Sequence, residues 1–300
     1  MSAKPFNKLV CALGMIAVLD SSGAFADDIS SPSADAALAP GAEARPLWEV
    51  GLAGGVGSFS DYPASDRYRV RALPLPYFIY RGGIFRSDAS GPRLHTGAGN
   101  VEFEFSAGGT LSSTSHSGPR EGMPKLDYLL EAGPNTKITL GKPTPSSRLL
   151  VDLPVRAAVS TNFSSRFDWR GVIFTPDLAY EDEAILGSRW GGRAAVGVEF
   201  ATARLQQFWY GVAPQYANTP EQPDRSAYDA HGGYLGSRLT LSAYRPLTRN
   251  FNIYFAGQFD LYAGAENQNS PLFKSKTGAG GIIGFAWSIW QSKERESVIH

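Results

Sequence analysis

The sequence predicts an all-β fold, a transmembrane antiparallel up-and-down β-barrel of about twelve strands. Apolar and polar residues alternate with a period of two over most of the chain. The alternating segments run for about ten residues, which suits a strand tilted across a membrane better than a strand of a soluble sheet. Many of the apolar faces end in Trp, Tyr or Phe, as they do at the two interfaces of a membrane barrel.

The N-terminal residues predict export. Lys4 and Lys8 precede an apolar stretch over residues 9–19, and Ala24 and Ala26 stand where a signal peptidase requires small residues. The stretch is too short to span a membrane, which takes about 20 apolar residues. We therefore expect residues 1–26 to be a signal peptide and residues 27–46 a flexible leader, so that the mature chain contains no cysteine.

We expect twelve strands in the remainder of the chain. In residues 100–107, for example, Val101, Phe103 and Phe105 share one face and the residues between them are polar. The expected strands cover residues 48–58, 68–79, 83–95, 99–107, 126–140, 148–160, 168–181, 193–203, 206–214, 234–246, 251–263 and 277–290. They predict one barrel over residues 47–291 and a tail at 292–300.

Two of these strands contain residues that interrupt a ladder. The segment 88–92 includes Gly91 and Pro92 and breaks the strand at 83–95. Pro74 and Pro76 remove hydrogen-bond donors from the strand at 68–79, which predicts a bulge or an irregular edge. A soluble β-sandwich is the alternative fold, because its strands alternate in the same way.

Counting strands back from the C-terminus predicts the side on which each connection lies. Segments 214–233 and 264–276 are long and polar, whereas 203–205 and 245–250 are short, so we expect the long pair outside the cell and the short pair in the periplasm. By the same count the long segment 108–125 falls on the periplasmic side. Either a strand is miscounted or this periplasmic loop is atypical.

The expected lumen carries charges of both signs. Mixed signs predict cross-strand ion pairs in a narrow or plugged lumen rather than an ion-selective pore. The acidic run 181–183 is expected to be solvated charge in an external loop. The inward charged residues are Glu102, Glu104, Glu131, Lys137, Asp152, Arg156, Arg193, Glu199, Arg238 and Asp260.

The sequence contains no strong catalytic or metal motif. It has no metalloprotease, nucleophile-elbow or P-loop pattern, and its four histidines are not spaced as a metal-binding pair. His95 and Ser106 lie on adjacent expected strands, but Ser106 has lumenal parity, which argues against a hydrolase on the outer wall. A formal net charge of +0 gives no indication of nucleic-acid binding. We therefore expect no enzyme activity, no cofactor and no metal.

Several short motifs, in order, resemble the MipA/OmpV family of outer-membrane proteins. Each motif is weak alone, but their order and spacing cover essentially the whole mature chain. Trp290 is where such a barrel commonly ends on an aromatic residue, although residues 291–300 follow it here. The matching segments are DYPASD at 61–66, PLPY at 74–77, YRGG at 80–83, GMPKLD at 122–127, Gly133-Pro134 and Tyr210-Gly211-Val212.

The resemblance implies an outer-membrane barrel surrounded by lipid. The namesake of the family is described as a scaffold that links a lytic transglycosylase to a penicillin-binding murein synthase, and other members as osmotic or adhesion-related proteins. We therefore expect a scaffold for murein synthesis and remodelling, with a small-solute channel as the alternative. If segment 108–125 is periplasmic, its Arg120, Glu121, Met123 and Lys125 are the expected partner contacts.

Overall fold

The computed structural model describes residues 46–81, 85–88, 91–94, 100–113, 117–164 and 166–294. The expected signal peptide at 1–26, nearly all of the expected leader and the end of the tail lie outside these residues. His95 and His116 lie outside them as well.

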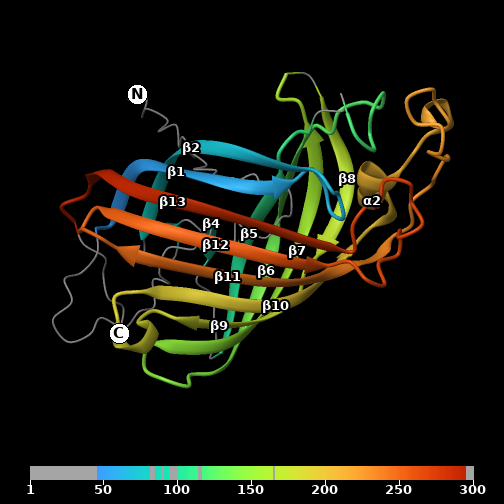
Figure 1. Cartoon of the computed structure of the whole chain (residues 1–300). Helices are drawn as coiled ribbons and strands as arrows, with labels where there is room; N and C mark the ends of the chain where they lie inside the picture. The colour runs from blue at the N-terminus through green and yellow to red at the C-terminus, as the bar shows by residue number, and fades with distance from the viewer. Residues whose placement is uncertain are drawn as a thin grey trace, which may run out of the picture.

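The described strands form one antiparallel sheet that closes into a barrel (Figure 1). Neighbours in sequence pair with one another, and β13 pairs with β1 to close the ring. This is the predicted up-and-down β-barrel. The strands are β1 (Trp48–Ser60), β2 (Tyr68–Arg81), β3 (Phe85–Asp88), β4 (Gly91–Leu94), β5 (Val101–Thr110), β6 (Tyr128–Gly141), β7 (Ser147–Thr161), β8 (Phe167–Phe174), β9 (Asp177–Asp182), β10 (Gly191–Ala201), β11 (Gly233–Pro246), β12 (Phe251–Leu261) and β13 (Thr277–Gln291).

Two expected strands are divided in the structure. The strand at 83–95 is a hairpin of two short strands, β3 and β4, which meet where Asp88 pairs with Gly91. The strand at 168–181 is one line interrupted at Pro176, because β8 and β9 pair with successive parts of β7. The thirteen strands therefore fill twelve positions around the ring.

The expected strand at 206–214 is wrong. Residues Ala203–Tyr210 form a helix, α2, that begins after Thr202. Leu205 and Trp209 are spaced four residues apart and are both buried, which is helical periodicity. A three-residue 3-10 turn, η2 (Pro214–Tyr216), follows α2.

This helix corrects the predicted orientation of the loops. Because α2 does not cross the barrel, residues 202–232 are a single connection between β10 and β11. Segment 111–127 then lies at the same end of the barrel as 202–232 and 262–276, which we call the loop end. The opposite end, the turn end, carries the short turns 142–146, 183–190 and 247–250, together with residues 46 and 294, where the described chain begins and ends. The expectation that 108–125 faces away from the other long loops is therefore wrong.

The prolines of β2 mark an irregular edge. The ladder between β1 and β2 runs through Pro74 and Pro76 without a register shift, so the expected bulge is absent. On its other side, within the described residues, β2 pairs with β3 only at Tyr80 and Arg81. The donors that the two prolines lack are therefore those that would point away from β1.

The outer wall is apolar. Its exposed aliphatic residues include Val56, Val196, Leu241 and Ile283, and Ile283 keeps 62% of its surface exposed. A belt of exposed aromatic side chains lies near each end, as expected at membrane interfaces. The turn-end belt includes Trp48, Tyr180, Trp287 and Trp290, and the loop-end belt includes Tyr68, Phe167, Trp169 and Phe200.

In the part of the chain that the structure describes, no helix has the length and apolar character needed to cross a membrane.

Candidate functional site: an occupied lumen beneath a packed cap

Along the described strands, polar side chains alternate with the apolar residues of the outer wall and point into the lumen. Arg238 lies between strands β10 and β12 and joins a carboxylate from each. Its Nη1 is 2.7 Å from Glu199 Oε1, and its Nε donates to Asp260 Oδ1 at 2.6 Å. Gln258 Nε2 donates to the second oxygen of Asp260 at 2.9 Å. These charged side chains are between 3% and 6% exposed, so the group is shielded from water.

A second arginine, Arg156, lies on β7 and faces the same part of the lumen as Arg238. Arg156 Nε donates to Glu131 Oε2 at 3.2 Å, and Nη1 donates to Ser106 Oγ at 3.0 Å. Its Nη2 donates to Thr175 Oγ1 at 3.2 Å. One guanidinium therefore ties β7 to β6, to β5 and to the end of β8. Ser106 faces the lumen as predicted and accepts a hydrogen bond from a cation, so it is not placed as a nucleophile on the outer wall.

A third group of ion pairs lies nearer the turn end. Arg193 Nη2 lies 2.7 Å from Asp152 Oδ2 and 2.8 Å from Asp177 Oδ1. Glu181 pairs with both Arg193, at 3.4 Å, and Arg148, at 2.7 Å. The expectation that Glu181 is solvated loop charge is therefore wrong. Its position at the end of β9, with inward parity, was the signal that sequence reasoning missed.

These groups form a ladder of ion pairs along the lumen wall from β5 to β12, and a fourth pair, Lys137 Nζ to Glu104 Oε2 at 2.9 Å, extends it. Between Arg156, Arg193 and Arg238 lies a cavity of about 40 Å³, which has room for a few water molecules. The predicted cross-strand pairing of charges of both signs is present, and a plugged lumen stays a prediction.

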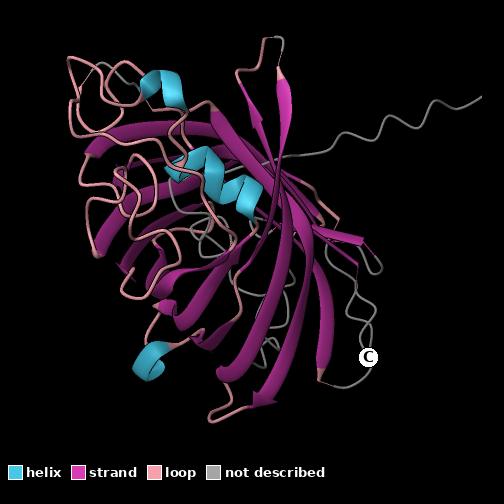
Figure 2. Cartoon of the chain, turned by 90° about the vertical axis from the view of Figure 1, so that its right-hand side faces the viewer, coloured by secondary structure: helices cyan, strands magenta, loops and turns pink. Residues whose placement is uncertain are grey.

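The loop end is closed by a cap, which we define as segments 61–67, 117–127, 202–232 and 262–276. Figure 2 faces this end and shows α2 and the loops lying across the ring of strands. The cap has an apolar core that continues onto inward residues of the barrel strands, among them Leu129, Ile173 and Leu235, and aromatic residues enter it from three of the four segments. Its buried members include Tyr62, Met123, Leu126, Leu205, Trp209, Tyr210, Val212, Tyr262 and Leu272.

Buried tyrosine hydroxyls join the segments of the cap. Tyr62 donates to the carbonyl oxygen of Leu272 at 2.9 Å, and Tyr210 donates to that of Pro63 at 3.0 Å. The two rings meet edge to face, with centroids 6.4 Å apart. Each hydroxyl thus satisfies a loop carbonyl that would otherwise be buried without a donor.

Two arginines hold the predicted contact loop against the rest of the cap. Arg120 Nη1 donates to Trp209 O at 3.0 Å, and its guanidinium lies 6.0 Å from the centroid of the Tyr62 ring. Arg225 Nη1 donates to the carbonyl oxygens of Pro119 and Glu121, at 3.0 and 2.7 Å. Arg225 was not singled out from sequence, because a lone arginine in a polar loop gives no indication of burial.

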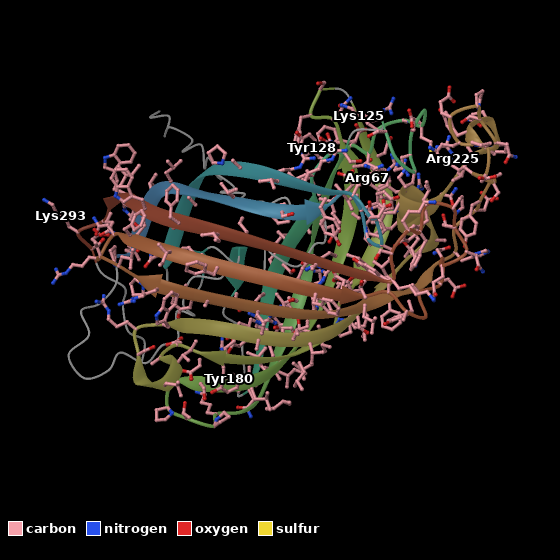
Figure 3. The ribbon with its side chains drawn as sticks, viewed as in Figure 1. Arg67, Lys125, Tyr128, Tyr180, Arg225 and Lys293 are labelled. Atoms are coloured by element: carbon pink, nitrogen blue, oxygen red, sulfur yellow. The ribbon has the colours of Figure 1, made fainter. Side chains whose placement is uncertain are left out.

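The four predicted partner contacts differ in accessibility. Arg120 and Met123 are buried in the cap, at 8% and 7% exposed, so they brace the loop and are not presented to a partner. Lys125 is exposed and Glu121 is half-buried. Figure 3 shows Lys125 near Arg67 and toward the end of the barrel that carries Arg225, with Lys293 at the opposite end. Contact through Lys125 and Glu121 stays a prediction, and it requires the loop end to face the partner.

Burial changes the titration of the groups in the cap. Removal from water raises the pKa of Tyr62 to about 12, an effect that the nearby Arg120 guanidinium partly opposes. Burial also raises the pKa values of Tyr210 and Tyr262. It lowers the pKa of Arg120 to about 10, because the charged guanidinium is the form that burial disfavours.

We expect the cap to lose stability as the pH rises from 10 to 12. Over this range an unfolded tyrosine releases a proton that folded Tyr62 keeps, so the free energy of unfolding falls with pH. Arg120 acts in the opposite direction, but Tyr210 and Tyr262 act with Tyr62. Tyr62→Phe should therefore flatten the loss, measured as the rate of limited proteolysis of residues 202–232 against pH. Equal slopes for the two proteins would contradict this assignment.

No group of three His, Cys, Asp or Glu side chains suited to a metal ion occurs among the described residues. The charged residues of the lumen instead lie in arginine–carboxylate pairs.

A closed antiparallel barrel with an apolar outer wall, a lumen lined by ion pairs and a packed cap defines a membrane-spanning β-barrel of the outer-membrane type. The family model described as "MltA-interacting protein MipA" matches residues 50–289, and the chain belongs to this family. Among curated proteins none matches the chain.

A solved structure similar to the chain is the crystal structure of the outer membrane protein OprG from Pseudomonas aeruginosa. The two are 10% identical, the alignment covers 81% of this chain and 97% of that chain, and the TM-score is 0.22. The closed ladder of strands and the family define the fold.

Proposed function

We propose that this outer-membrane barrel is a scaffold that holds murein-synthesising and murein-remodelling enzymes at the membrane, without catalytic chemistry of its own. The observation that carries the proposal is the set of ion pairs on the lumen wall beneath the cap. Arginine–carboxylate pairs join neighbouring strands along this wall and a packed cap lies over the loop end, which favours a membrane anchor over an open solute channel. The family description, an MltA-interacting protein, supports a lytic transglycosylase as one partner.

The same proposal includes two finer points. A penicillin-binding murein synthase is the second partner that the family resemblance implies. Export through residues 1–26 as a signal peptide would deliver the chain to the outer membrane.

The turn end is the side that we assign to the periplasm. Its connections at 142–146 and 247–250 are short, whereas the loop end carries connections of 31 residues at 202–232 and 15 at 262–276. Barrels of the outer membrane have short periplasmic turns and longer external loops. In this orientation Lys125 points away from the periplasm, and the partner surface lies at the turn end.

Cysteine labelling of intact cells tests the orientation. The only natural cysteine is Cys11, in the expected signal peptide, so single cysteines in the barrel can be labelled without background. We expect Lys125→Cys to react with an impermeant maleimide in intact cells, and Lys142→Cys to react only after the outer membrane is broken. The reverse pattern would return the loop end to the periplasm, and with it the contacts at Glu121 and Lys125.

Binding of purified proteins tests the function. The folded barrel, in detergent micelles or lipid nanodiscs, is immobilised and exposed to the lytic transglycosylase and to the murein synthase of the same cell. Saturable binding of either enzyme is expected. The proposal fails if neither binds to a barrel that still shows the heat-dependent gel shift of a folded outer-membrane protein, or if the barrel conducts ions in planar bilayers in porin-like steps.

A further inference from the structure

The turn between β9 and β10 presents an unusual leucine at the turn end. Leu186 lies in the 3-10 turn η1 (Ile185–Gly187) and is 100% exposed. Its backbone is left-handed, with φ 52° and ψ 34°, a conformation that a leucine rarely adopts. An apolar side chain held in water on an unfavourable backbone is a feature that accumulates at functional sites.

Hydrogen bonds hold this turn in one shape. Ile185 N donates to Trp190 O at 2.8 Å, and Ser188 N donates to Ile185 O at 3.0 Å. The neighbouring turn supports it, because Glu183 N donates to Ser146 O at 2.9 Å. Leu186 is therefore presented on a preorganised turn, which reduces the entropy lost when a partner binds.

A second leucine lies close to this turn. Strands β10 and β11 pair from Gly191 to Tyr244, so the turn before β10 is next to the turn after β11. That second turn contains Leu247, which is 47% exposed. The two turns are joined by Arg245, whose guanidinium lies over the ring of Trp190, 5.6 Å from its centroid.

The exposed charges at this end are mainly positive. Among the described residues, the exposed charged side chains at the turn end are four cations and one anion: Lys142, Arg189, Arg249 and Lys293, and Glu294. The acids next to the leucine turn, Asp182 and Glu183, are half-buried, and Asp182 accepts hydrogen bonds from Ser146 and Ala184. At the loop end the corresponding set is nearly balanced. It consists of Arg67, Lys125, Arg166, Arg204, Lys274 and Lys276 against Asp66, Glu221, Asp224, Asp229 and Glu266. The excess of positive charge is therefore specific to the end that carries the exposed leucines.

We propose that Leu186 and Leu247, together with the exposed Lys142 and Arg189 at the same end of the barrel, form the surface on which the periplasmic partner enzyme docks. The partner of this surface is a protein that presents an apolar pocket bordered by carboxylates. The inference rests on the proposed scaffold function and adds to it the docking surface and the chemistry of the partner. An apolar anchor surrounded by complementary charge is the usual arrangement of a protein–protein hot spot.

The chain provides a matched pair of substitutions for the leucine. Leu186→Asn removes the apolar side chain, and asparagine tolerates the left-handed backbone, so the turn is expected to keep its fold. Phe163→Asn is the control, because Phe163 is also left-handed, with φ 59°, and 58% exposed, but lies at the loop end. We expect Leu186→Asn to weaken binding of the lytic transglycosylase about tenfold or more, and Phe163→Asn to leave it unchanged.

Charge reversal tests the electrostatic part. Lys142→Glu with Arg189→Glu should slow association at low ionic strength and reduce the dependence of the affinity on salt. The matched control is Arg204→Glu with Lys274→Glu at the loop end, which should leave both quantities unchanged.

The outcomes separate this inference from the proposed function. If the wild-type barrel binds neither murein enzyme, the scaffold function fails and this surface with it. If the wild type binds but the turn-end variants bind equally well, the function stands and the docking surface is wrong. The surface is also wrong if the turn-end variants weaken binding of the enzyme only in nanodiscs of anionic phosphatidylglycerol and not in nanodiscs of phosphatidylcholine. These residues would then act through lipid headgroups.

Discussion

Replacing Arg238 by methionine is expected to lower the free energy of unfolding of the barrel by about 3–5 kcal/mol. Methionine keeps much of the volume of the side chain but removes the charge. Glu199 and Asp260, which are 6% and 3% exposed, are then left in the lumen without the cation that joins them. Urea unfolding in detergent micelles, followed by tryptophan fluorescence, measures the change.

Two further variants separate the lost ion pairs from a general effect of the substitution. Arg189→Met makes the same chemical change on an exposed turn and should alter the free energy of unfolding by less than about 0.5 kcal/mol. The triple variant Arg238→Met with Glu199→Gln and Asp260→Asn removes the whole charged group, so it should recover more than half of the loss. If the triple variant is less stable than Arg238→Met alone, the carboxylates do not depend on Arg238 as described.

The lumen shows how far the sequence alone can predict this fold. Alternation correctly placed Arg156, Glu199, Arg238 and Asp260 on the inward face, because side chains in a strand alternate strictly. It did not predict which charges meet. Arg156 pairs with Glu131 although its ladder partner on β8 is Ile173, and Ala158 is the residue opposite Glu131. Partners across a lumen depend on strand register and side-chain reach, which a single strand does not encode.

Residues 203–214 show where the same reasoning failed. Aromatic and β-branched residues favour strands, so the run Phe208-Trp209-Tyr210 predicts a strand at 206–214. The signal that identifies the helix is the spacing of Leu205 and Trp209, which places both on one helical face. This misassigned segment reversed the expected side of the loops between residues 95 and 203, because each strand of an up-and-down barrel inverts the direction of the chain. The division of the expected strand at 83–95 into β3 and β4 restores the count for the loops before it.

The GMPK motif at 122–125 lies in the cap and has a structural role there. Its Met123 is packed in the cap, and the neighbouring Arg120 donates to Trp209 O. The motif is therefore explained by the packing of a loop on α2. Neither composition nor period predicts such a contact, because it joins segments about 90 residues apart.

Trp209→Ala is the second substitution from which we expect a large effect, and the effect should be confined to the cap. Trp209 is 2% exposed, and replacing a buried tryptophan by alanine costs about 3–5 kcal/mol. The residue contributes to the apolar core of the cap and accepts the hydrogen bond of Arg120 through its carbonyl oxygen. We expect rapid proteolysis within residues 202–232, together with a nearly normal heat-dependent gel shift of the barrel.

The control for Trp209→Ala is Trp290→Ala. Trp290 is 63% exposed on the outer wall, so its loss removes a lipid contact and should leave cleavage of the cap unchanged. A Trp209→Ala barrel that unfolds as a whole, without prior cleavage of the cap, would show that cap and barrel form one cooperative unit.

The Trp209→Ala barrel also tells which element closes the lumen. If the cap alone blocked it, loosening the cap would allow ions to pass in planar bilayers. The ion pairs of Arg156, Arg193 and Arg238 lie beneath the cap on the lumen wall and leave a cavity of about 40 Å³ between them, so we expect the variant to remain non-conducting. Conduction by Trp209→Ala alone would assign closure to the cap, and the ladder of ion pairs would then serve stability only.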